Sequence, residues 1–82
     1  MTQTGTAQTG MTRELEFLVF AMERYRQAKG LTPREVADVF RNHGLSQVVL
    51  DNYYLYHIEL PAHMIADLDS YRLTGKPLDA EM

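Results

Sequence analysis

The segment Gly30–Val36 constrains the fold more than any other part of the sequence, because it combines the end of one helix with the start of the next. Thr32 is a preferred N-cap residue, since its hydroxyl can accept a hydrogen bond from a backbone N–H of the first turn. Pro33 would occupy the first helical position, where no N–H is needed. Glu35 would complete a capping box with Thr32. Gly30 can adopt the left-handed conformation that ends many helices, so the segment predicts two helices joined by a tight turn.

The two helices on either side of this turn follow from the spacing of apolar residues. The first is predicted from about Arg13 to Lys29, with Thr12 as its N-cap. Its apolar face comprises Leu15, Phe17, Leu18, Phe20, Ala21, Met22 and Tyr25. The second is predicted from Pro33 to about Asn42, and Gly44 would end it with a positive φ. Its buried stripe comprises Val36, Val39 and Phe40, with Leu31 and Val36 as a hydrophobic staple.

A third helix is predicted from Gln47 to about His57, with Ser46 as its N-cap. It has almost no polar side, because it contains Val48, Val49, Leu50, Tyr53, Tyr54, Leu55 and Tyr56, with Ile58 next. Valine, isoleucine and tyrosine also favour strands. The length of the run and the lack of alternation favour a helix. A helix that is apolar all round lies at the centre of a fold or against a partner.

A fourth helix is predicted from about Ala62 to Leu73, because Pro61 ends the preceding helix and Gly75 can end this one. Its inner stripe comprises Met64, Ile65, Leu68 and Tyr71 or Arg72. Asp67 and Asp69 are expected on its outer side. The pattern predicts an all-α fold, a compact bundle of four short helices with flexible termini.

The length and composition indicate a single domain and exclude several classes of partner. Residues 1–11 are rich in Thr, Gln and Gly and predict a disordered tail, residues 12–75 the helical domain, and residues 76–82 a flexible acidic tail. With 82 residues the core is small, and such domains often gain stability from a partner. A net charge of −3 disfavours nucleic acid. The lack of cysteine and of a membrane-length apolar run predicts a cytoplasmic protein without membrane association.

No residue pattern in the sequence predicts an enzyme. There is no nucleophile elbow, no glycine-rich phosphate loop and no metalloprotease pair. Ser46 is interpreted as a cap and Ser70 as an outer residue. The carboxylates of Asp67 and Asp69 diverge, because residues two apart do not share a helix face. Glu14, Glu16 and Glu23 are interpreted as a solvated face, and we predict no catalytic residue.

The histidines do not form a metal-binding pattern. His57 and His63 lie six positions apart across Pro61, whereas ligands on one helix face lie three or four apart. His43 and Glu59 do not add ligands at a suitable spacing. Each histidine lies near a predicted helix end, where a lone histidine usually forms a hydrogen bond or faces water. We predict no metal and no cofactor.

A helix-turn-helix is the alternative functional reading. The segment Leu31–Ser46 resembles the sequence rhythm of bacterial helix-turn-helix regulators, with a recognition helix starting at Ser46. Such a helix uses Arg, Lys, Asn or Gln to reach bases and phosphates. Here Gln47, Asp51 and Asn52 are present, but no lysine or arginine occurs from Ser46 to Ala62. The predicted turn is also longer than the usual one, so DNA binding remains the less favoured function.

The tyrosines of the third helix favour binding to another protein. Tyr53, Tyr54 and Tyr56 combine apolar area with a polar hydroxyl, a combination that is enriched where proteins meet. Together with Leu50 they exceed what so small an interior can cover. We predict that these four residues bind a protein partner or a second copy of the chain.

The sequence also resembles a family of short bacterial proteins of unknown function. The resemblance runs from about Met11 to Arg72 and is carried by Glu14–Phe17, Tyr25, Lys29, Leu31–Thr32, Glu35–Val36, Phe40, Gly44, Tyr53–Leu55 and Asp67–Tyr71. Family members are often described beside putative toxin genes. The resemblance therefore implies an antitoxin-like or accessory role. It implies no activity, cofactor or catalytic residue.

Overall fold

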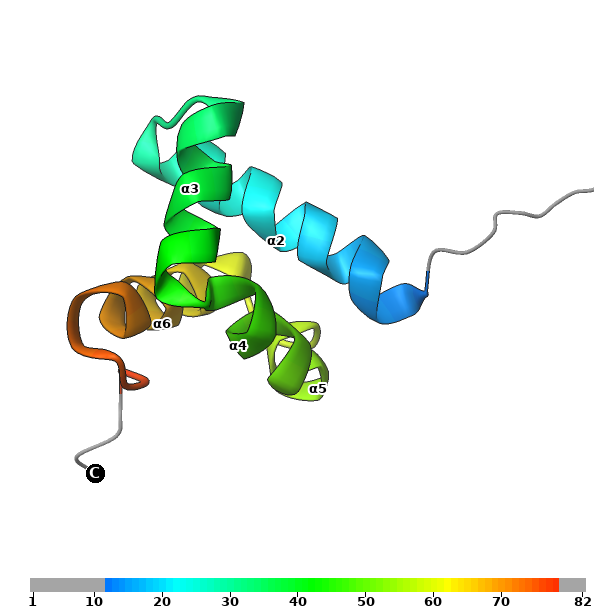
Figure 1. The fold of residues 1–82 in the computed structure, drawn as a ribbon. Helices are drawn as coiled ribbons and strands as arrows, with labels where there is room; N and C mark the ends of the chain where they lie inside the picture. Colours follow the sequence, from blue (N-terminus) through cyan, green and yellow to red (C-terminus); the bar gives the residue numbers. More distant parts are fainter. Residues whose placement is uncertain (1–11, 79–82) are drawn as a thin grey trace, which may run out of the picture.

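The computed structural model describes residues 12–78, and within them the chain forms helices and no strand. The helices are α2 (Arg13–Lys29), α3 (Pro33–His43), α4 (Leu45–Asp51), α5 (Tyr53–Tyr56) and α6 (Pro61–Thr74) (Figure 1). The predicted all-α fold is confirmed. The predicted N-terminal tail, residues 1–11, and residues 79–82 lie outside the described residues.

The turn between α2 and α3 has the predicted capping geometry. Glu35 N–H donates to Thr32 Oγ1 over 3.1 Å, and Thr32 N–H donates to Glu35 Oε1 over 2.8 Å. Gly30 has a φ of +69° and ends α2 in the left-handed conformation. Arg26 fixes the turn from the side, because its guanidinium donates to the Leu31 carbonyl over 3.1 Å. Local side-chain chemistry therefore determines where both helices meet.

The predicted third segment is helical, but the chain forms two shorter helices there instead of one, and the predicted Ser46 cap is wrong. α4 begins at Leu45, directly after Gly44 with its φ of +65°, so Ser46 lies inside the helix and makes no capping bond. Asn52 separates α4 from α5, with φ −110° and ψ 22°. Its side-chain amide donates to the Val48 carbonyl over 2.9 Å. The Val48 carbonyl therefore accepts from both the side chain and the backbone N–H of Asn52, an asparagine contact of the kind that competes with regular helix geometry.

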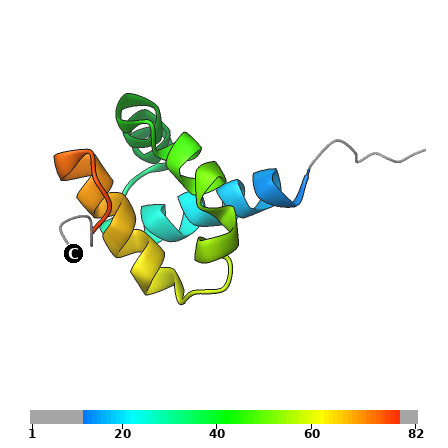
Figure 2. The same cartoon turned by 90° about the horizontal axis from the view of Figure 1, so that it is seen from below.

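The helices enclose one core, in which α2 contacts α3, α4 and α6. Figures 1 and 2 show α3 and α6 near the C-terminal half of α2, whereas the N-terminal turns of α2 extend past them. The buried core residues are Ala21, Tyr25, Val36, Phe40, Leu45, Val49, Tyr56, Met64 and Leu68. The first half of α2 is not covered by α3 or α6, and its Phe17 ring meets Tyr53 of α5.

The aspartates of α6 do not face outward as predicted. Both are partly buried: Asp69 accepts a hydrogen bond from the Tyr25 hydroxyl over 2.6 Å, and Asp67 accepts one from the Tyr56 hydroxyl over 2.8 Å. A buried tyrosine hydroxyl needs a polar partner, and α6 supplies one for each. Asp67 also accepts from the Leu78 N–H over 2.8 Å, which ties part of the predicted acidic tail to α6.

Candidate protein-binding surface

The predicted partner-binding residues separate into surface and core. Tyr54 is 80% exposed, whereas Leu50 and Tyr53 are half-buried. Tyr56 is only 2% exposed and belongs to the core. Its side chain therefore has almost no surface to offer a partner, and of the three tyrosines only Tyr53 and Tyr54 remain available.

An aromatic surface joins α2 to α5 and comprises Phe17, Phe20, Tyr53, Tyr54 and His57. The Phe17 ring lies 5.6 Å from that of Phe20, and it meets Tyr53 edge-on at 5.5 Å. Tyr53 contacts Tyr54 edge-on at 5.6 Å and stacks on His57 at 4.6 Å. These distances are typical of favourable aromatic pairs, so the five rings support one another.

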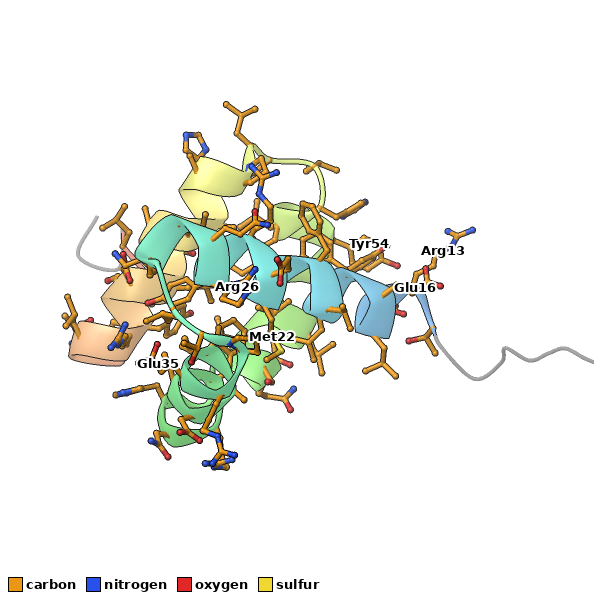
Figure 3. All side chains as sticks on the ribbon, turned by 90° about the horizontal axis from the view of Figure 1, so that it is seen from above. Arg13, Glu16, Met22, Arg26, Glu35 and Tyr54 are labelled. Carbon is orange, nitrogen blue, oxygen red and sulfur yellow. The ribbon has the colours of Figure 1, made fainter. Side chains whose placement is uncertain are left out.

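Backbone geometry fixes the histidine of this surface. His57 Nδ1 lies 2.8 Å from the Tyr53 carbonyl oxygen, and the two rings are inclined by only 2°. Tyr54 contacts the same imidazole edge-on at 6.0 Å. The side chain of Tyr54 therefore protrudes from a supported base rather than from a mobile loop, and Figure 3 shows it beside the N-terminal half of α2.

Phe20 belongs to this surface because α2 extends beyond its neighbours. The sequence places Phe20 and Leu15 on the apolar face of the first helix, but they are 42% and 40% exposed. The guanidinium of Arg24 lies over the Phe20 ring, 5.8 Å from its centroid. Sequence reasoning did not assign Phe17 and Phe20 to the partner-binding site. Their spacing of three residues indicates a shared face, but periodicity does not show which faces a neighbour covers.

The polar groups beneath the surface serve the fold. Burial, followed by the hydrogen bond to Asp67, raises the pKa of the Tyr56 hydroxyl far above its usual value. Burial and the Asp69 carboxylate likewise raise the pKa of Tyr25, although its hydroxyl also accepts a hydrogen bond from Arg72 over 3.1 Å. Both phenols stay neutral and hydrogen-bonded, which suits structural roles.

One hollow lies beside Leu55 on the α5–α6 side of the molecule. It has a volume of about 270 Å³ and is lined by Leu55, Glu59, His63, Ala66, Asp67 and Leu78.

Within residues 12–78, no cluster of three or more His, Cys, Asp or Glu side chains has the arrangement to hold a metal ion. The same part of the chain contains no helix with the length and apolarity to span a membrane.

The surface of α4 does not suit the recognition helix of a helix-turn-helix protein. α3 and α4 are separated by Gly44 alone, so the longer turn predicted from the sequence is wrong. Gln47 donates to Asp51 Oδ1 over 2.7 Å, and α4 carries no lysine or arginine. A helix without lysine or arginine lacks the cations that supply most of the affinity for the phosphate backbone. We therefore continue to expect no sequence-specific DNA binding.

Comparison with known proteins places this arrangement in a family. A family model described as "Protein of unknown function (DUF3791)" matches residues 16–72. The chain belongs to the DUF3791 family. The match runs from the first turn of α2 almost to the end of α6 and contains the whole aromatic surface of this DUF3791 chain. No curated protein and no solved structure matches it.

Proposed function

We propose that this DUF3791 chain is a non-catalytic protein-binding module whose partner covers the aromatic surface. The exposure of Tyr54, 80% on a base of packed rings, is the observation that carries the proposal. A fully buried aromatic side chain removes roughly 150–250 Å² from water. Covering Tyr54 and Phe20 together would therefore supply a substantial part of the apolar area at the centre of a standard interface, which buries about 800 Å² on each partner.

The ring contacts beneath Tyr54 favour binding, as does the apolar area that its side chain exposes. Tyr53 lies between Phe17 and His57, with ring contacts on both sides. Side chains that already hold their bound geometry lose little conformational entropy on association. Tyrosine is also among the residues whose truncation most weakens interfaces. The surface thus has the composition and the rigidity of an interaction centre.

The family resemblance adds a more specific form of this proposal. On the toxin association that the resemblance in the sequence implies, we propose an antitoxin-like or accessory role, exerted by binding rather than by catalysis. The polar clusters of the described residues support the non-catalytic part, since Asp67 and Asp69 accept hydrogen bonds from core tyrosines.

Photo-cross-linking in the native cell tests the proposal. A benzophenone amino acid replaces Tyr54 in one variant and Leu73 in the control, because these side chains are 80% and 81% exposed. We expect the probe at position 54 to cross-link the chain to a polypeptide, and the probe at position 73 to give no comparable product. If a folded, expressed chain gives no cross-linked product from position 54, the aromatic surface does not bind protein.

A further inference from the structure

Two opposite charges flank Phe20 at equal distances on α2. Glu16 precedes Phe20 by four residues and Arg24 follows it by four, so all three lie along one exposed stripe of the helix. Within residues 12–78, neither Glu16 nor Arg24 makes an ion pair. The Arg24 guanidinium lies over Phe20 instead. The stripe therefore presents a negative end, an aromatic centre and a positive end.

Such a stripe is complementary to itself. If two copies of α2 pack antiparallel about a two-fold axis at Phe20, Glu16 of each copy faces Arg24 of the other, and the two Phe20 rings meet. We propose that a second copy of this chain occupies the aromatic surface in this orientation. The proposal rests on the proposed function, which it deepens by naming the partner, and an isologous pair of this kind is the commonest form of oligomer.

The dimensions of an α-helix agree with this pairing. Four residues rise about 6 Å, so each charge lies about 6 Å from the axis along the helix. Packed helices lie about 8–10 Å apart, a separation that glutamate and arginine side chains can bridge. A parallel pair in the same register would place Glu16 against Glu16 and Arg24 against Arg24. Like charges disfavour that orientation, so the charges specify the antiparallel one.

The remaining exposed side chains on this side of α2 are neutral in the pairing or already have a partner of opposite charge. Arg13 and Gln27 lie seven residues before and after Phe20, so the antiparallel pair places a cation opposite a neutral amide. Glu23 would lie opposite Phe17, and its charge is already balanced by Arg26 at 2.6 Å. Arg26 therefore offsets the charge of Glu23, the acid that this pairing brings near Glu16 of the second copy.

A charge exchange tests the pairing in the purified full chain by sedimentation velocity over a concentration series. We expect the wild type to form a dimer at micromolar concentration. Glu16→Arg and Arg24→Glu should each raise the dimer dissociation constant about tenfold or more, because each creates two like-charge contacts. The double variant E16R/R24E exchanges the charges and should restore dimerisation. Glu14→Arg is the matched control, because it makes the same charge change on another side of the same helical turn and should leave the dimer intact.

A single introduced cysteine gives an independent measurement, because the chain contains none. At the proposed axis the helix spacing leaves roughly 4–5 Å between the two Cα atoms of residue 20, within reach of a disulfide. Phe20→Cys should therefore form a disulfide-linked dimer under mild oxidation much faster than Leu73→Cys.

Three results would overturn the inference: a wild type that stays monomeric, a double variant that fails to recover, or equal oxidation rates for the two cysteines. A monomeric wild type whose residue 54 still cross-links to a different protein in cells would overturn the second copy as partner and retain the proposed function. Circular dichroism of every variant separates these results from a loss of folding.

Discussion

Tyr25 of α2 donates a hydrogen bond to Asp69 of α6 over 2.6 Å, across 44 positions of sequence. The same carboxylate accepts from Lys29 over 2.7 Å. One aspartate therefore joins the C-terminal half of α2 to α6 and satisfies the hydroxyl of a fully buried tyrosine. This contact fixes the C-terminal half of α2 against α6, whereas the first turns of α2 extend past α6.

Removing the Asp69 side chain should destabilise the protein more than removing a surface aspartate does. Asp69→Ala should lower the free energy of unfolding by about 1–3 kcal/mol, because Tyr25 loses its acceptor inside the protein. Asp38→Ala is the matched control, since Asp38 pairs with Arg41 on the surface, and its loss should cost about 0–1 kcal/mol. Urea denaturation of both variants measures the difference, and equal costs would show that the α2–α6 contact is no stronger than a surface pair.

Acid should weaken the same contact. Burial alone would raise the pKa of the Asp69 carboxyl, but hydrogen bonds from Lys29 and Tyr25, and the nearby positive charges, outweigh burial and lower it below its usual value. The unfolded state then binds the proton more tightly. The stability from Asp69 is therefore present above the unfolded pKa of about 3.9, and is lost as pH falls through the lower folded pKa.

The measurement is the free energy of unfolding of wild type and Asp69→Asn across this acid range. The variant cannot release or bind that proton, so its stability should decline less steeply than that of the wild type as pH falls. Parallel curves would contradict the assignment of acid sensitivity to Asp69.

The cap at the α2–α3 turn gives a prediction from local structure. Thr32→Ala should lower the free energy of unfolding by about 0.5–2 kcal/mol, because the Glu35 N–H loses its acceptor. Thr32→Ser keeps a hydroxyl at this position and should retain most of the stability. Urea midpoints of the two variants check this, and an Ala variant as stable as the Ser variant would contradict it.

These residues also show what a sequence can predict about this fold. Thr32, Glu35 and Gly30 act on backbone groups within a few residues, so the α2–α3 boundary follows from local chemistry. The partners of Tyr25 and Tyr56 lie on α6, and helical spacing does not specify which faces of distant helices meet. For the same reason Asp67 and Asp69 were assigned outward, although each receives a hydrogen bond from the core.

The candidate surface was predictable in part. Tyr54 stands out in the sequence because the third helical segment has too many apolar residues for a small interior, and its exposure agrees with that argument. Tyr56 follows the same pattern but lies in the core, where its hydroxyl donates to Asp67 of α6. Phe20 belongs to the predicted apolar face of the first helix, but periodicity does not reveal that α2 extends past α3 and α6 and leaves this side chain 42% exposed.

Size-exclusion chromatography of the wild type and Tyr54→Ser, each purified and in native cell extract, tests the central claim most directly. The account predicts that the wild type elutes as a dimer or a larger complex. Tyr54→Ser should elute as a monomer with an unchanged circular dichroism spectrum, because its side chain contributes to the surface and not to the core. A wild type that elutes as a monomer in both settings, or a Tyr54→Ser variant that associates as the wild type does, would contradict it.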